Sequence, residues 1–215
     1  MNYAKTYQQA LERAGVKDDS IHHEFVSGAH GVKLDFDVTH KNRSSLLYMA
    51  GVMMKASMIM RDFEGSDSIG VLGIDTGTTQ HARDVATVIL SSGFDTRVFP
   101  LTTVKSIQNG QKFIELTDET KELLVDHRIT SVVIDDDVGT TGSSTAQPIP
   151  TMRDLGVQDT TVYYDWVRNP RLPRLDELQV AYRGMIEAWL PDYQPDDCVL
   201  CDSGVPLVPY GREPM

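Results

Sequence analysis

Apolar residues along this chain fall into two kinds of pattern, short β-branched runs and longer stretches with a helical repeat. Short runs bounded by polar turns are typical of buried strands, whereas apolar residues at every third or fourth position favour helices. The two kinds alternate from about residue 45 onward, which indicates βαβ units and a mainly parallel sheet flanked by helices. The expected strands are 68–74, 96–100, 129–135, 160–167 and 182–186, and the expected helices are 45–61, 80–91 and 118–126.

The apolar stretches do not predict a membrane span or a secretory signal. The first sixteen residues have the pattern of a polar, amphipathic helix. The apolar stretch 46–60 is interrupted by Lys55 and is too short to cross a bilayer. Its methionines are more typical of core filler than of a ligand site. We therefore expect a cytoplasmic protein with no membrane partner.

Composition and charge limit the possible partners. The chain has 215 residues, 40% of them hydrophobic, which is enough for one large domain with a small appended lobe. Its formal charge of −11 argues against nucleic acid as a partner, because a nucleic-acid backbone favours a basic face. An anionic substrate is still possible, since bound Mg²⁺, backbone amides or local lysines can make an electropositive pocket.

Residues 131–144 combine a buried strand, three carboxylates and a turn of small residues. Asp135, Asp136 and Asp137 fall at the carboxyl end of the strand, where open α/β sheets bind ligands. The turn at 140–144 is rich in hydroxyls and can offer backbone N–H groups to a phosphate. The segment therefore suits a phosphorylated ribose, although an acidic strand end followed by an ordinary capped helix would have a similar sequence.

This segment resembles the signature of the type I phosphoribosyltransferases: four mostly apolar residues, two acidic ones, two more, then Thr-Thr-Gly and a small residue. The resemblance implies that Asp136 and Asp137 hold the ribose hydroxyls of phosphoribosyl pyrophosphate. Asp135 stands at a usually apolar place, so the pair could be shifted by one residue, but the spacing to the turn favours Asp136 and Asp137. The implied donor-binding residues are Asp136, Asp137, Val138, Gly139, Thr140, Thr141, Gly142, Ser143 and Ser144.

A second turn of small residues follows the strand expected over 68–74. In the type I phosphoribosyltransferases the loop after the first core strand contacts pyrophosphate. We expect Thr78 or Thr79 to cap the helix that follows, and the turn taken alone would be an ordinary strand-to-helix connection. The residues that match the family's pyrophosphate loop are Asp75, Thr76, Gly77, Thr78 and Thr79.

The N-terminal stretch 26–37 resembles the start of the orotate phosphoribosyltransferases, where a Ser-Gly pair, a basic residue and an aromatic strand form part of a hood over the base. Lys33 or His30 could contact a carboxylate or ring oxygen, and Phe36 could help enclose a planar base. Val26 stands where those enzymes carry a lysine, which is a departure from the orotate pattern. A two-residue alternation that places Phe36 in the core fits the same residues.

Two further positions concern the leaving group and the base. Orotate phosphoribosyltransferases carry a mobile loop with Arg-Lys, a second lysine and His-Gly, but here only Lys105 and Lys112 could supply such a charge, and Lys105 is the candidate catalytic residue. Trp166 could stack on the base and Arg168 could bind its oxygen atoms. Aromatic residues at strand ends also pack under loops, and an arginine there can be structural.

The end of the chain raises two structural questions. Pro148 and Pro150 predict that the helix after the phosphate turn is a short cap and restarts near Pro150. Cys198 and Cys201 form a single CxxC, which is half of a four-ligand zinc site. We expect two reduced cysteines in a tail turn, with zinc binding or a redox pair as alternatives.

The resemblance implies one α/β domain over residues 1–215, with a core at about 62–190 and a hood formed by about 20–45 and the tail 191–215. It also implies a homodimer that uses Mg²⁺ to transfer ribose 5-phosphate from phosphoribosyl pyrophosphate to a base, with orotate or a related pyrimidine as the expected acceptor. Two other classes of protein fit the sequence. One is a non-catalytic sensor of the same fold, and the other is an unrelated phosphosugar or nucleotide hydrolase.

Overall fold

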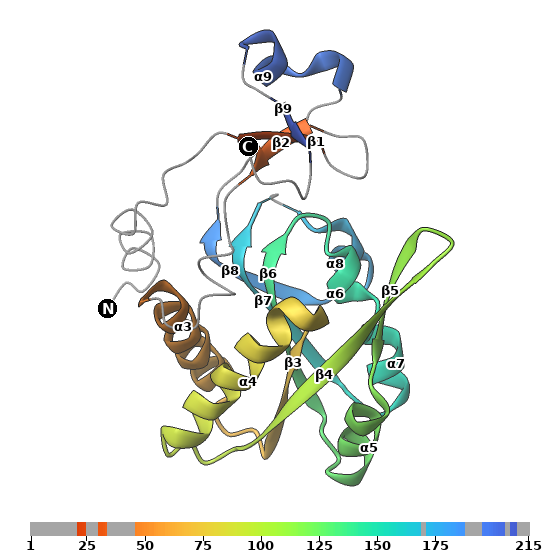
Figure 1. Cartoon of the computed structure of the whole chain (residues 1–215). Coiled ribbons are helices and arrows are strands. Elements are labelled where there is room, and N and C mark those ends of the chain that lie inside the picture. The colour runs from red at the N-terminus through yellow and green to blue at the C-terminus, as the bar shows by residue number, and fades with distance from the viewer. Residues whose placement is uncertain are drawn as a thin grey trace.

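A six-stranded sheet forms the body of the molecule (Figure 1). The computed structural model describes residues 21–24, 30–33, 46–168, 171–187, 195–204 and 207–209. The strand order is β5-β4-β3-β6-β7-β8, in which β5 alone runs antiparallel to its neighbour. The strands are β3 (Ser68–Gly73), β4 (Arg97–Gln108), β5 (Gln111–Leu116), β6 (Ser131–Gly139), β7 (Asp159–Val167) and β8 (Ala181–Glu187).

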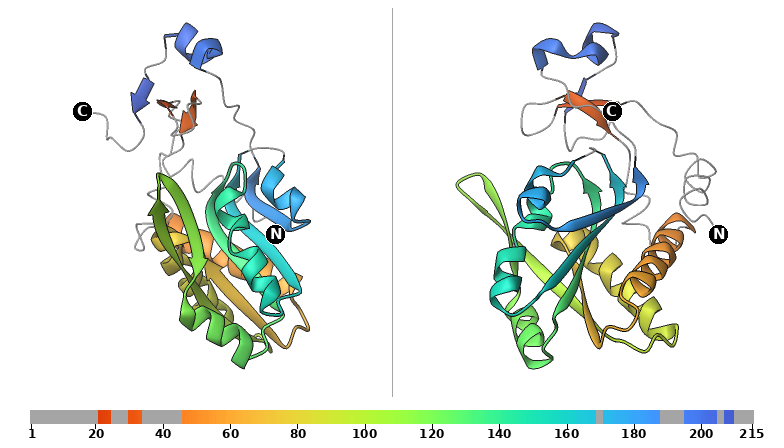
Figure 2. Two further views of the ribbon diagram at one scale, coloured as in Figure 1. Left: turned by 90° about the vertical axis from the view of Figure 1, so that its right-hand side faces the viewer. Right: turned by 180° about the vertical axis from the view of Figure 1, so that it is seen from behind.

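Helices cover both faces of this sheet (Figure 2). Helices α3 (Leu46–Asp62) and α4 (Asp75–Ser91) pack over one face, against Val71 and Val133. The other face carries α5 (Asp118–Asp126), α6 (Ser143–Ala146), α7 (Ile149–Asp154) and α8 (Pro173–Glu177), over Leu72 and Val132. Neighbouring residues of one strand thus face opposite layers, which explains the continuous apolar runs. The predicted parallel sheet flanked by helices is confirmed.

Several element boundaries follow directly from local sequence signals. Helix α5 has the predicted bounds, because Thr117 caps it by accepting a hydrogen bond from the Thr120 N–H at 3.2 Å. The helix after the turn at 140–144 is interrupted as the prolines predicted: α6 ends at Ala146, and α7 begins at Ile149 with Pro150 in its first turn.

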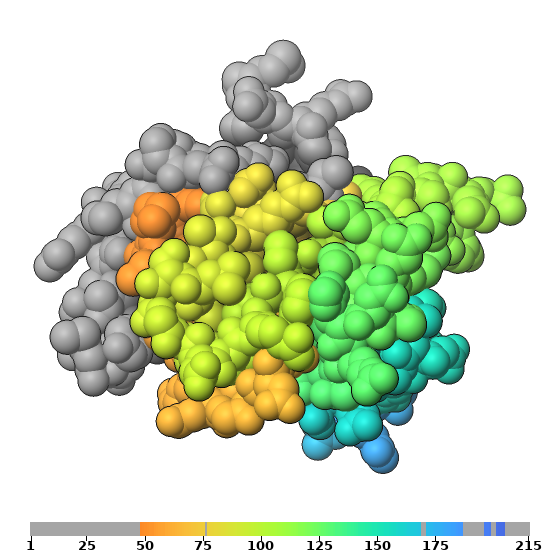
Figure 3. Space-filling model, turned by 90° about the horizontal axis from the view of Figure 1, so that it is seen from below, coloured from red at the N-terminus to blue at the C-terminus, as the bar shows by residue number. Residues whose placement is uncertain are grey.

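Residues 101–112, expected to contain a loop, instead form a β-hairpin that projects from the body of the molecule (Figures 1 and 3). Strand β4 continues through Pro100, because at that position it pairs with β3 alone and its other edge needs no N–H donor. The turn between β4 and β5 is Asn109-Gly110, with φ of 51° and 77°. Positive φ at both residues is typical of a type I′ hairpin turn, and Asn-Gly between segments with alternating hydrophobic residues is the signal that predicts it.

A smaller sheet joins the two ends of the described chain. Its order is β2-β1-β9, formed by β1 (Ile21–Glu24), β2 (His30–Lys33) and β9 (Leu207–Pro209). The N-terminal segment and the tail therefore pair in one sheet, which lies beyond the carboxyl ends of the main strands (Figures 1 and 2). A short 3₁₀ turn (Pro195–Asp197) and α9 (Val199–Asp202) precede β9. Among the described helices, none has the length and apolar content needed to cross a membrane.

Candidate functional site

The carboxyl ends of β3 and β6 lie side by side, since Gly73 pairs with Asp135 in a parallel register. Both turns of small residues therefore leave the sheet at one edge. Strand β6 runs four residues further than predicted, to Gly139, so all three aspartates are strand residues. Their side chains alternate between the two faces of the sheet, and this alternation gives them different surroundings.

Asp135 belongs to a buried ion cluster under α3 and α4. The Lys55 ammonium of α3 contacts Asp135, lies 2.7 Å from an Asp165 carboxylate oxygen, and donates to the Asp136 carbonyl oxygen at 2.9 Å. His81 Nδ1 of α4 lies 2.7 Å from the other Asp135 oxygen. Burial alone would lower the pKa of Lys55, but the attraction of the two carboxylates outweighs it and raises that pKa above its usual value. Lys55 and His81 therefore hold the Asp135 carboxylate in the interior of the protein.

Asp136 and Asp137 precede the turn at 140–144 in the sequence. Asp136 is nearly buried, in register with Tyr164 of β7, whose hydroxyl contacts Thr145 of α6 at 2.6 Å. Burial, and then the nearby charge of Asp137, raise the pKa of Asp136 well above its ordinary range. Asp137 is half-buried and accepts the N–H of the following residue at 2.7 Å. With Asp135 engaged elsewhere, this arrangement supports Asp136 and Asp137 as the ribose pair.

The turn at 140–144 is tight and lined by hydroxyls. Thr141 and Ser143 are exposed, with their side-chain oxygens 2.7 Å apart, and the Ser143 N–H points to Thr141 Oγ1 at 3.3 Å. Gly142 has a φ of 74°, and a Cβ there would lie 2.8 Å from Leu175 Cγ of α8. Both features require glycine. The turn thus exposes two hydroxyls ahead of the first N–H groups of α6.

Residues 75–79 form the first turn of α4, which corrects the expectation of a loop before a helix at 80. Thr78 and Thr79 do not cap the helix: their hydroxyls donate back to the Ile74 and Asp75 carbonyl oxygens, at 2.5 and 2.7 Å. The helix begins early because its first turn packs directly on the strand end. A Cβ on Gly73 would lie only 2.5 Å from Thr79 Cα.

Asp75 opens α4 in a left-handed conformation, with a φ of 64°. Thr103 of β4 holds this backbone: its hydroxyl accepts the Asp75 N–H at 2.9 Å and donates to the Gly73 carbonyl oxygen at 3.0 Å. Thr103 was not among the predicted site residues. The Asn-Gly hairpin signal would have placed it in β4, beside β3.

Both hairpin lysines reach Asp75. Lys105 Nζ lies 3.0 Å from an Asp75 carboxylate oxygen, and Lys112 Nζ lies 3.6 Å from the same atom. The lysines come from β4 and β5, and both remain partly exposed. The structure thus brings Lys105 and Lys112, which the paired hairpin carries, next to the α4 turn that the sequence linked to pyrophosphate.

The candidate base-binding residues are only partly described. Trp166 and Arg168, at the end of β7, are 2% and 3% exposed, and the Arg168 N–H donates to the Gly139 carbonyl oxygen at 2.9 Å. Such burial favours the core role of Trp166. Lys33 is described only by its backbone pairing with Ile21, whereas Phe36 lies outside the described residues. The same holds for Val26, and His30 is again described only by its backbone.

The CxxC lies at α9, away from these turns. Cys198 is buried and Cys201 exposed, and no disulfide joins the two thiols. Slight desolvation and a hydrogen bond with Cys198 raise the pKa of Cys201. Within the described part of the chain, no three His, Cys, Asp or Glu side chains are placed to hold a metal ion. Zinc binding stays an untested alternative to the expected pair of reduced cysteines.

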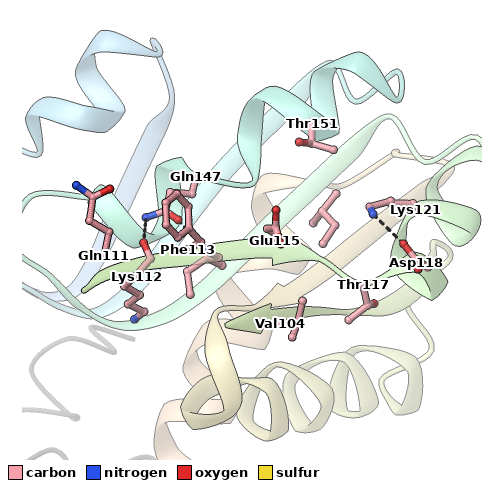
Figure 4. A pocket seen from close by; sticks show the side chains of 12 residues that line it. Val104, Gln111, Lys112, Phe113, Glu115, Thr117, Asp118, Lys121, Gln147 and Thr151 are labelled. Atoms are coloured by element: carbon pink, nitrogen blue, oxygen red, sulfur yellow. Dashed lines mark hydrogen bonds and ion pairs between the residues drawn. The ribbon is translucent and has the colours of Figure 1, made fainter. Parts of the chain in front are cut away.

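A groove of about 1060 Å³ lies between the hairpin and α5 to α7 (Figure 4). Gln147 spans one end of it, accepting the Ile114 N–H at 2.6 Å and donating to the Lys112 carbonyl oxygen at 3.3 Å. The groove contains neither Asp136 and Asp137 nor the turn at 140–144, so we do not assign binding of the ribose donor to it. Its lining residues are Val104, Gln111, Lys112, Phe113, Ile114, Glu115, Leu116, Thr117, Asp118, Lys121, Gln147 and Thr151.

Solved structures with this fold include two phosphoribosyltransferases. Orotate phosphoribosyltransferase from Aeropyrum pernix is 18% identical over 86% of this chain and 92% of its own, with a TM-score of 0.57. Adenine phosphoribosyltransferase from Saccharomyces cerevisiae, complexed with an imino-altritol bisphosphate and adenine, is 14% identical over 84% and 99%, with a TM-score of 0.51. No protein-family model and no curated protein matches the sequence significantly. The chain has the fold of the type I phosphoribosyltransferases.

Proposed function

We propose that this chain transfers ribose 5-phosphate from phosphoribosyl pyrophosphate to a nitrogenous base and releases pyrophosphate. One observation carries the proposal. At the end of β6, Asp135 is locked under the helices, which leaves Asp136 and Asp137 directly before the hydroxyl-lined turn and beside the α4 turn that gathers Lys105 and Lys112.

Each group of this site would bind one part of the donor. Asp136 and Asp137 would accept hydrogen bonds from the ribose hydroxyls, and the turn at 140–144 would hold the 5′-phosphate through N–H groups and hydroxyls. The first turn of α4, with Lys105 and Lys112, would face the pyrophosphate. The acidic overall charge does not prevent this, because two lysines and a helix N-terminus supply local positive potential.

The reaction would be displacement at the anomeric carbon. A ring nitrogen of the base forms the new bond while the bond to the pyrophosphate oxygen breaks, through an oxocarbenium-like transition state. The hairpin lysines would stabilise the negative charge that develops on the leaving group. Since positioning and charge stabilisation supply most of the rate, no protein nucleophile is needed.

Magnesium fits this site as a companion of the substrate. Mg²⁺ is usually bound through substrate phosphates and only one or two carboxylates, so a dedicated set of protein ligands is not required. When bound, it would supply further neutralisation of the pyrophosphate charge.

For the acceptor we propose orotate or a related pyrimidine. The N-terminal stretch supports this choice through its resemblance to the orotate phosphoribosyltransferases. Formation of a homodimer, also implied by that resemblance, stays a prediction that light scattering can test.

One feature favours a second candidate, a sensor that binds the donor without catalysis. The hairpin lysines are paired to Asp75, and the chain lacks the Arg-Lys and His-Gly of the orotate loop. A sensor would bind phosphoribosyl pyrophosphate tightly and form no nucleotide.

Labelled phosphoribosyl pyrophosphate incubated with Mg²⁺ and a panel of bases tests these functions. We expect a base-dependent nucleotide product, and we expect the variant with Asp136→Asn and Asp137→Asn to release no pyrophosphate. Binding without product would support the sensor instead. Hydrolysis that does not depend on the base would indicate a phosphosugar hydrolase. Unchanged turnover in the double variant would contradict the assignment of Asp136 and Asp137 to the site.

A further inference from the structure

We propose that Lys55 is a positioning residue for the ribose site: its ammonium ties α3 to the end of β6 and so fixes Asp136 and Asp137 relative to the first turn of α4. This inference rests on the function proposed above. The sequence presents Lys55 only as an interruption of the apolar stretch 46–60 and does not connect it with the site.

The ammonium of Lys55 donates two hydrogen bonds, to the Asp135 carboxylate and to the Asp136 carbonyl oxygen. It also forms an ion pair with the Asp165 carboxylate at 2.7 Å, and the lysine side chain is fully buried. The contacts reach two neighbouring strands, β6 and β7. The Lys55 side chain of α3 therefore holds the end of β6 in place. It does so through the backbone of Asp136, a proposed ribose-binding residue.

A second contact of Asp135 extends this link to α4. Its other carboxylate oxygen lies 2.7 Å from His81 Nδ1, and Tyr48 of α3 packs edge-on against the His81 ring, with ring centroids 5.2 Å apart. Helix α4 also carries the turn that faces the proposed pyrophosphate site. The cluster consequently sets the distance between that turn and the acidic pair.

Stability alone does not explain such a cluster. Replacing a buried ion pair by apolar residues of similar volume is often neutral or stabilising, because removing the charges from water is costly. What an apolar set could not supply is the directional hydrogen bond to the Asp136 carbonyl oxygen. This contact assigns a positioning role to Lys55.

The test removes the charges of the cluster while keeping its shape, in a variant with Lys55→Met, Asp135→Asn and Asp165→Asn. Its binding of ribose 5-phosphate and of inorganic phosphate is compared with that of the unmodified protein by calorimetry. Ribose 5-phosphate uses the acidic pair, whereas inorganic phosphate has no hydroxyls for that pair to bind. We expect affinity for ribose 5-phosphate to fall about tenfold, the loss of roughly one hydrogen bond to a charged group, and affinity for phosphate to stay within about twofold.

The matched control is Lys121→Met with Asp118→Asn, an exposed ion pair on α5 whose atoms lie 2.8 Å apart. We expect it to change neither affinity. Equal weakening of both ligands by the cluster variant would show general loosening and overturn the inference, as would unchanged binding of ribose 5-phosphate. If the triple variant does not fold, Lys55→Gln, which keeps a donor without the charge, is measured in the same way.

Failure of the proposed function has a different signature. The unmodified protein would then bind ribose 5-phosphate no better than phosphate. In that case amide hydrogen exchange decides the inference without a ligand. Faster exchange at residues 136–139 in the cluster variant, with unchanged exchange at 131–134, supports the positioning role, and equal exchange in both proteins overturns it.

Discussion

At the scale of single residues, three consecutive aspartates of β6 have three different environments. Asp135 is paired with Lys55 and His81, Asp136 is nearly buried and forms no ion pair with a cation of the described residues, and Asp137 is half-buried at the strand end. Composition does not distinguish the three aspartates, but strand alternation and burial give them different environments. An acid that is buried beside another acid opposes folding whenever it is ionised.

Asp136→Asn should therefore stabilise the protein at neutral pH while it abolishes activity. Because the folded-state pKa of Asp136 lies above its value of 3.8 in the unfolded chain, the folded state holds this proton more tightly. Stability consequently falls as pH rises from the unfolded pKa through the folded pKa. Thermal unfolding between pH 3 and pH 8 should show a higher Tm for the variant at pH 8, by about 2–4 °C for each kcal/mol, and no gain at pH 3.

The control for this prediction is Asp118→Asn, because a hydrogen bond and the charge of Lys121 lower the pKa of Asp118. That substitution should leave Tm unchanged or slightly lower at neutral pH. A Tm for Asp136→Asn that equals or falls below that of the unmodified protein at pH 8 would contradict the burial argument.

At the scale of elements, the hairpin of β4 and β5 replaces the expected loop as the carrier of positive charge. A paired hairpin holds its lysines in a defined register, and here both meet Asp75 at the start of α4. The Asp75 carboxylate thus pairs with both lysines. Pyrophosphate, with more charge than one carboxylate, would compete for them.

Replacing both Lys105 and Lys112 by Met should weaken inhibition by inorganic pyrophosphate about tenfold for each lysine, since a hydrogen bond to a charged group contributes roughly 1.5–3 kcal/mol. Asp75→Asn should strengthen it, because the internal competitor is removed. Inhibition constants measured at two salt concentrations test both effects, with Lys121→Met as the exposed-lysine control. Equal inhibition constants for all these variants would show that the hairpin lysines do not contact the leaving pyrophosphate.

At the scale of the whole molecule, the chain divides its proposed tasks between two sheets. The six-stranded sheet carries both turns and the acidic pair, whereas the small sheet pairs the N-terminal segment with the tail through β1 and β9. We propose that the large sheet binds the donor and that the small sheet, as a hood, helps to enclose the base. The two halves of that hood are far apart in sequence and depend on one strand pairing.

A chain that ends at Ser203 lacks β9 and should lose base-dependent turnover while it still binds phosphoribosyl pyrophosphate. The unfolding transition of the large sheet should change little, because β9 pairs with β1 and not with the six-stranded sheet. Val208→Thr, which keeps strand propensity, serves as the control. Full turnover by the shortened chain would exclude β9 from the acceptor site.

The sequence by itself determined the layered α/β fold, the bounds of α5, the break between α6 and α7, and the segment that suits a phosphorylated ribose. These features depend on local periodicity, caps and prolines, which act within a few residues. Only the tertiary structure decided that Lys55 and His81 pair with the Asp135 carboxylate. It also decided that Thr103 binds the backbone of Asp75 and that the hairpin lysines reach the α4 turn. Those contacts join residues far apart in the chain, and no local pattern encodes which buried charges will meet.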